Sequence, residues 1–185
     1  MANININFYP LHLKQSQFIL NIRLAKQQDL VHILELIRLS IRHMDDKGIK
    51  QWPDWYPNED DFVHDITKKQ LFVSENEQQI TGFVTLSPDC PPEYDGVKWK
   101  KTNGKVNSVH RLAVHPGLKT PKLAQRLMKY VEDLARNEGY SLIRLDTYSK
   151  NTIANKFYKK LAYQFCGDIN LQFMPEKYHC YEKEI

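Results

Sequence analysis

The chain has 185 residues, 42% of them apolar and 26% charged, which predicts a single ordinary domain with a core of its own. Its net charge of +4 is modest and its basic residues are dispersed, which argues against a nucleic-acid partner but does not exclude an anionic cofactor. It has no apolar run of membrane-spanning length and no signal-peptide pattern, so we expect a cytoplasmic protein without a membrane partner. The three widely spaced cysteines, Cys90, Cys166 and Cys180, predict free thiols and no metal site.

The first third of the chain predicts one strand, two helices and a loop rich in aromatic residues. Residues 1–17 are polar and weakly periodic, so we treat them as an N-terminal extension whose order is left open, before a domain at 18–185. Alternation over residues 18–24 predicts a half-buried strand. Asp29 is then expected to cap a helix, and Asn58 to cap a shorter second one. One face of the strand carries Phe18, Leu20, Ile22 and Leu24.

The middle of the chain predicts a hairpin followed by a long loop. Residues 71–87, LFVSENEQQITGFVTLS, contain two β-rich runs around a polar turn. Pro88 then opens a loop that lasts to about Gly104, and loops of this length in compact domains are often functional or mobile.

The stretch from 105 to 136 reads as a buried strand, a loop and a strongly amphipathic helix. Thr120 and Pro121 are expected at the N-cap and the first helical position, and Gly139 is expected to stop the helix. A helix N-terminus after a strand offers free amides and a positive dipole end, which suits a phosphate or pyrophosphate. The same pattern is also typical of any strand, loop and helix in succession.

The remaining segments complete a mixed α/β order. Residues 141–147 predict a buried strand, 151–161 a helix, and 163–169 and 173–181 two closing strands. The expected order of elements is β, α, α, β, β, β, α, β, α, β, β.

Two motifs in this order resemble the GNAT acetyltransferase superfamily. RLAVHP at 111–116, followed by an amphipathic helix, resembles its acyl-CoA-binding motif, and NTIANKFYKKL at 151–161 is similar to its second motif. The resemblance covers roughly residues 18–181 and implies the GNAT fold, a mixed and largely antiparallel sheet of about six to seven strands flanked by about four helices. It also implies direct acetyl transfer from acetyl-CoA to a primary amine of a small molecule or peptide, and it leaves a homodimer open.

The resemblance places the cofactor on the central strand and on the loop after it. In the family a bulge in this strand leaves backbone groups free for the cofactor, and the matching region here is Leu112, Ala113 and Val114. In the family this loop reads Arg or Gln, two residues, Gly, one residue, then Gly or Ala; those positions fall on Lys119, Lys122 and Ala124. Lysine therefore replaces the central glycine, and it either reaches the phosphates through its ammonium group or removes the affinity of the loop. The implied cofactor-binding residues are Leu112, Ala113, Val114, Lys119, Thr120, Lys122, Leu123, Ala124, Asn151 and Tyr158.

Tyr158 is implied as the acid that protonates the departing thiolate. Helical spacing puts Ile153, Phe157 and Leu161 on a core stripe, and Tyr158 on an adjacent line that suits a residue aimed at a cleft. The alternative is a tyrosine that only packs its ring.

His110 is the candidate general base. Two-residue alternation puts it on one face of the central strand with Ser108 and Leu112, and an unperturbed imidazole titrates near working pH. A histidine that is hydrogen-bonded within the strand is the alternative.

Aromatic residues of two loops are the candidates for substrate binding. Their rings suit a cationic or aromatic amine, although a lid that packs on the protein itself gives the same pattern. Because of Lys122, a second hypothesis is kept: a non-catalytic GNAT-fold module that senses acyl-CoA or binds a partner. The candidate substrate-binding residues are Trp52, Trp55, Tyr94 and Trp99.

Overall fold

The computed structural model describes residues 21–118, 120–172 and 174–185. The predicted extension at 1–17, the start of the first predicted strand at 18–20, and the single residues Lys119 and Phe173 lie outside the described residues. The strands are β1 (Asn21–Leu24), β2 (Leu71–Asn76), β3 (Gln79–Ser87), β4 (Val106–Val114), β5 (Leu142–Tyr148), β6 (Gln164–Ile169) and β7 (Tyr178–Glu184). The helices are α1 (Leu30–Asp45), α2 (Glu59–Thr67), α3 (Leu123–Asn137) and α4 (Thr152–Lys160), with short 3-10 turns η1 (Gln27–Asp29) and η2 (Pro92–Gly96).

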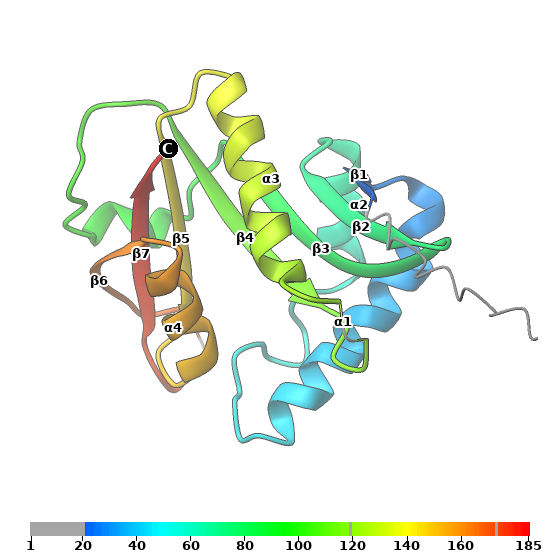
Figure 1. Ribbon diagram of the computed structural model, residues 1–185. Helices are drawn as coiled ribbons and strands as arrows, with labels where there is room; N and C mark the ends of the chain where they lie inside the picture. Colours follow the sequence, from blue (N-terminus) through cyan, green and yellow to red (C-terminus); the bar gives the residue numbers. More distant parts are fainter. Residues whose placement is uncertain (1–20, 119, 173) are drawn as a thin grey trace, which may run out of the picture.

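All seven described strands form one sheet in the order β1-β2-β3-β4-β5-β7-β6. Every neighbouring pair is antiparallel except β4 and β5, so the prediction of a mixed, largely antiparallel sheet with four α-helices is confirmed for the described part of the chain. The paired residues of β4 and β5 run from Val106 opposite Leu142 to Ser108 opposite Arg144. Beyond them the two strands diverge and open the middle of the sheet (Figure 1).

A bulge interrupts β4 just where it separates from β5. His110 lies opposite Thr85 and Ala113 lies opposite Phe83, so two residues, Arg111 and Leu112, face a single residue of β3. Arg111 has a φ of 50°, in the left-handed region that bulges exploit and that a non-glycine residue rarely adopts. The bulge ends the two-residue alternation on which the predicted common face of Ser108, His110 and Leu112 depended.

Helices cover both faces of the sheet (Figure 1). Successive strand residues point to opposite faces. Accordingly Phe72 packs in one cluster with the apolar side of α3 and with Tyr158 of α4, whereas Val73 packs in another with α1 and α2. Two layers of core therefore enclose the sheet, and both border the region where β4 and β5 diverge.

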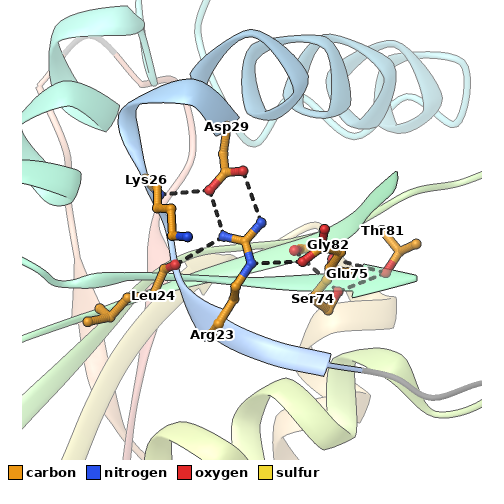
Figure 2. A network of polar contacts seen from close by, with 8 residues as sticks. All are labelled: Arg23, Leu24, Lys26, Asp29, Ser74, Glu75, Thr81 and Gly82. Carbon is orange, nitrogen blue, oxygen red and sulfur yellow. Dashed lines mark hydrogen bonds and ion pairs between the residues drawn. The ribbon is translucent and has the colours of Figure 1, made fainter. Parts of the chain in front are cut away.

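The N-terminal edge of the sheet is held by a network around Arg23 (Figure 2). Arg23 donates to both carboxylate oxygens of Asp29, at 2.7 and 3.0 Å, and through Nε to Glu75 at 2.8 Å. Arg23 is half-buried among these partners. Leu24, which was expected on the apolar face of this strand, is instead 39% exposed. Asp29 is the N-cap residue of α1, as predicted, but its side chain accepts from the backbone N–H of Lys26 and makes no capping hydrogen bond to α1.

The start of α3 also differs from the expectation. Lys122, and not Thr120, is the N-cap residue, and Pro121 lies in the preceding turn. Lys122 has φ 58° and ψ 25°, so the chain turns in a left-handed conformation there and helical geometry begins only at Leu123. By contrast, the Asn58 cap of α2 is confirmed, because Asn58 and Asp61 each accept a backbone N–H from the other.

The predicted core stripe of α4 is confirmed in part. Phe157 and Leu161 pack against the core, but Ile153 is 59% exposed, and Asn155 and Tyr158 are the buried residues of the helix. Asn155 donates to the backbone carbonyls of Tyr148 and Asn151, and these bonds hold its side of the helix against the sheet. No helix among the described residues has both the length and the apolar character that crossing a membrane requires.

Candidate active site

Two cavities lie side by side where β4 and β5 diverge. The first cavity has a volume of about 460 Å³ and is bordered by the β4 bulge, the C-terminal part of α1, α4 and the beginning of α3. The second cavity, of about 360 Å³, is bordered by β4, β5, the loop after α1 and the loop before β7. Both volumes suit a small ligand or part of a larger one. Four residues line both cavities: Gln51, Trp52, Leu112 and Tyr158.

The first cavity has a basic character. Its described lining includes no aspartate or glutamate, but it includes Lys47, His43 and His115. Lys47 Nζ, in the turn after α1, lies 2.8 Å from Nε2 of His43 at the end of α1, so the two side chains form one polar group on the cavity wall. A cavity with this lining favours an anionic ligand over a cationic one.

Most of the predicted cofactor-binding residues line this first cavity. Thr120, Lys122 and Leu123 do not line it, and Leu123, the first residue of α3, is instead buried in the core. Lys119 lies outside the described residues. The amides at the start of α3 have no acceptors within the helix, so this helix end remains a candidate anion site beside the cavity. The predicted residues that do line the cavity are Leu112, Ala113, Val114, Ala124, Asn151 and Tyr158.

Asn151 links α4 to the loop after α1. Its Oδ1 accepts the backbone N–H of Ala154 at 3.0 Å and caps α4, while its Nδ2 donates to Gln51 Oε1 at 2.7 Å. These bonds occupy the side chain, so its first role is to fix Gln51 between the two cavities. Gln51 was missed by sequence reasoning, because the two residues are 100 positions apart.

Tyr158 stands at the junction of the two cavities. Its side chain is only 7% exposed and its ring packs beside Tyr163 and Tyr181, with centroids 5.8 and 6.2 Å away. No described residue forms a hydrogen bond with its hydroxyl group. Burial, reinforced by the charge of Asp146, raises the pKa of Tyr158 well above its ordinary value. The phenol therefore keeps its proton at neutral pH and can donate it to a group in either cavity.

The second cavity contains a carboxylate that sequence reasoning missed. Asp146, on β5, lines it and accepts a hydrogen bond from Tyr94 Oη at 2.8 Å. Burial raises the pKa of Asp146 to about 6, and the charge of Glu93 also raises it, whereas the bond from Tyr94 opposes the shift. The available signal was an acidic residue inside a strand predicted to be buried, at 141–147, where a charge is costly unless it has a partner or a function.

His110 also lines the second cavity, from β4. Burial lowers the pKa of His110 to about 4, and the neighbouring charge of Arg111 lowers it further. The imidazole is therefore neutral at pH 7, and the expectation that it titrates near working pH is wrong. It keeps a free lone pair but is a weak base.

Arg111, the bulge residue, lines the second cavity but its charge is already engaged. Its Nη1 donates to Asp65 at 2.8 Å, and its Nη2 lies 3.6 Å from Asp61. Its guanidinium group also lies over the ring of Tyr56, 5.3 Å from the centroid. Thr85 donates a further bond to Asp65 at 2.7 Å. Two helical carboxylates of α2 thus hold the bulge of β4 in place.

The four predicted aromatic residues separate into two groups. Trp52 lines both cavities, and Trp55 lines the second and is 58% exposed. Tyr94 and Trp99 line neither cavity, which does not support their predicted contact with substrate. Tyr94 is 2% exposed and supports Asp146 from behind, and Trp99 donates through Nε1 to the Tyr94 carbonyl.

Comparisons with known proteins agree on one family. Residues 35–163 match the model of the Acetyltransferase (GNAT) family. An uncharacterized N-acetyltransferase of Bacillus subtilis (strain 168), YesJ, is 29% identical over 167 residues, covering 87% of this chain and 88% of its own. A crystal structure of a GNAT-family acetyltransferase from Streptococcus agalactiae 2603 superposes with a TM-score of 0.77 at 26% identity, covering 90% of this chain and 95% of its own. The PaiA N-acetyltransferase of Thermoplasma acidophilum, solved in complex with coenzyme A, has a TM-score of 0.67 at 17% identity and covers 90% and 99%.

Proposed function

Because the chain belongs to the GNAT acetyltransferase family, we propose that it is an N-acetyltransferase that transfers an acetyl group from acetyl-CoA directly to a primary amine. The observation that carries this proposal is the pair of cavities that meet at Tyr158. The first has a basic lining that suits the anionic coenzyme, and the second contains Asp146 and Glu93, which suit a cationic amine.

The first cavity fits acetyl-CoA in charge and in position. It lies between the diverging strands, where residues beyond Ser108 of β4 have no partner on β5 and leave backbone groups free for a ligand. The neighbour from Thermoplasma acidophilum, which shares the fold, binds coenzyme A. We assign the phosphates to the start of α3, with Lys119, Thr120, Lys122, Leu123 and Ala124, and further attraction to Lys47 across the cavity.

The reaction asks three things of the protein. Bound acetyl-CoA supplies an activated thioester carbon. A C–N bond forms at this carbon and its C–S bond breaks. The ammonium ion thereby becomes an amide, the coenzyme leaves as a thiol, and one proton is released. The protein must accept a proton from the amine, stabilise the carbonyl oxygen and hold a proton for the sulfur. We assign the last task to Tyr158, and the second to free backbone N–H groups of residues 112–114.

The proton acceptor belongs to the second cavity. His110 was the candidate from the sequence, and its neutral ring has a lone pair for the task. With a pKa of about 4, however, it holds a proton poorly at neutral pH. Asp146, with a pKa of about 6, is closer to the working range that favours general-base catalysis.

A non-catalytic module that binds acyl-CoA remains the second candidate, because lysine occupies the motif glycine at position 122. The structure weakens the objection from this lysine. Lys122 adopts the left-handed conformation that glycine usually supplies, so the turn into α3 forms without a glycine.

The first experiment is a calorimetric titration of the purified protein with acetyl-CoA and, separately, with CoA. We expect micromolar binding, about −8 kcal/mol, followed by release of free thiol when primary amines are added to the acetyl-CoA complex. No binding at millimolar ligand would overturn the proposal. Tight binding with no thiol release from any amine would favour the non-catalytic module.

A further inference from the structure

We propose that the second cavity selects a small cationic amine that carries no carboxylate group, and that Asp146 is the residue that binds its ammonium group. The proposal rests on the N-acetyltransferase function and names the class of its acceptor. Its basis is the arrangement of charged groups around the cavity.

Asp146 is placed and oriented to receive an ammonium group. It lies two residues beyond Arg144, the last residue of β5 that pairs with β4, and His110 lies two residues beyond the corresponding Ser108. The two side chains therefore border the opening from opposite strands. Tyr94 donates to Oδ1 of Asp146, whereas no described residue donates a hydrogen bond to Oδ2. Asp146 is only partly buried and lines the cavity, so one oxygen of this carboxylate is left for a ligand.

The cavity offers no free positive charge for a carboxylate among its described lining residues. Among these residues Arg111 is the only arginine, and there is no lysine. The guanidinium group of Arg111 already contacts Asp65 and Asp61. His110 is neutral at pH 7. A carboxylate in the acceptor would therefore enter beside Asp146 and Glu93 without a counter-charge, which costs free energy.

The remaining walls suit a cation. Trp52 and Trp55 contribute aromatic rings, and the faces of such rings attract ammonium groups. Glu93 lines the cavity from the exposed surface of η2 and offers a site for a second positive charge. A diamine can therefore use both carboxylates, whereas a monoamine can use only Asp146.

The test compares three amines of the same chain length by titration into the CoA-loaded protein: cadaverine, pentylamine and 5-aminopentanoate. We expect cadaverine to bind about threefold more tightly than pentylamine, because of the partly exposed second charge pair. We expect 5-aminopentanoate to bind at least about tenfold more weakly than pentylamine. Equal or tighter binding of 5-aminopentanoate would overturn the proposal, and so would the absence of binding by all three.

The role of Asp146 is tested by Asp146→Asn, which keeps an oxygen for the Tyr94 hydroxyl but removes the charge. We expect cadaverine to bind at least about tenfold more weakly to this variant while CoA binds unchanged, which shows that the fold is intact. The matched control is Asp95→Asn, which removes an exposed carboxylate of η2 that lines neither cavity and should not change amine binding. Unchanged cadaverine binding by Asp146→Asn would overturn the assignment.

The two proposals fail in different ways. Amine binding that depends on Asp146, with no thiol release from acetyl-CoA, would overturn the transferase function and support the amine site. Thiol release that is fastest with 5-aminopentanoate would support the transferase function and overturn the proposed acceptor class.

Discussion

Tyr158 lines both cavities, so removal of its hydroxyl group tests the chemical step directly. In Tyr158→Phe the ring can keep its packing against Tyr163 and Tyr181, while the transferable proton is lost. We expect kcat to fall by about 10² to 10⁴ and the Kd for acetyl-CoA to change by less than about twofold. Steady-state thiol release and calorimetry measure the two quantities.

A matched control for that variant is Tyr130→Phe, which removes a hydroxyl group from a tyrosine that packs on Phe72 and lines neither cavity. We expect it to leave kcat unchanged. A parallel loss of turnover and of acetyl-CoA affinity in Tyr158→Phe would argue for a packing role rather than for proton donation.

The pH dependence of kcat/KM shows whether activity requires the unprotonated form of Asp146 or that of His110. Either group must be unprotonated to act, so activity is lost as pH falls through its pKa. If Asp146 acts, kcat/KM should fall below pH about 6; if His110 acts, the fall should come only near pH 4. We expect kcat/KM of the wild-type protein to decline near pH 6, and this decline to be absent in Asp146→Asn. A wild-type decline only near pH 4 would favour His110 as the proton acceptor.

At the scale of elements, the sequence predicted those helices and strands whose local signals agree with their packing. The Asn58 cap, the hairpin at 71–87 and the Gly139 stop all depend on residues close in sequence, and all three are confirmed. The predicted start of α3 was wrong. Thr120 and Pro121 form a good capping pair, but Lys122 adopts a left-handed conformation and the helix begins only after it. The resemblance implied a bulge of the central strand near Leu112–Val114, but the left-handed conformation of Arg111 could not be predicted, because the partners of Arg111 come from α2.

Lys122 allows a test of the turn into α3. A left-handed backbone costs a non-glycine residue about 1 kcal/mol, although glycine also gains freedom in the unfolded chain. We therefore expect Lys122→Gly to raise the free energy of unfolding by no more than about 1 kcal/mol, measured by urea denaturation. If the ammonium group contacts the phosphates, the Kd for acetyl-CoA should rise about threefold to tenfold.

Lys122→Asn is the matched control, because asparagine also tolerates the left-handed region but carries no charge. We expect it to lose the same affinity as Lys122→Gly. Unchanged acetyl-CoA binding in both variants would show that backbone groups of the loop hold the coenzyme without the lysine.

At the scale of the whole molecule, the site is made by contacts between segments far apart in the chain. The motifs at 111–116 and 151–161 located the first cavity, but they carried no information on its far wall, which comes from α1. Tyr94 was predicted to meet substrate because it is aromatic and lies in a loop, and its bond to Asp146, 52 residues away, could not be read from spacing. The divergence of β4 and β5 determines which side chains line the two cavities, and no local sequence pattern predicts this divergence.

A partly buried carboxylate with a raised pKa should reduce the stability of the folded protein at neutral pH, and Asp146→Asn tests this. The pKa of Asp146 is about 6 in the folded state against a reference value of 3.8, so between these values the folded protein binds more protons than the unfolded chain. Stability from this group is therefore lost as pH rises through the window, by an amount on the order of 3 kcal/mol at neutral pH.

Asparagine still accepts the Tyr94 hydrogen bond but carries no charge to bury. We expect Asp146→Asn to be about 1–2 kcal/mol more stable than the wild type at pH 8, and nearly equal to it at pH 4, where Asp146 is protonated in the folded state. Urea denaturation of both proteins at the two pH values measures the difference, with the exposed Asp95→Asn as control. If the two proteins differ in stability by the same amount at both pH values, the pKa of the carboxylate is not raised. The stability cost expected of an amine site at this position would then be contradicted.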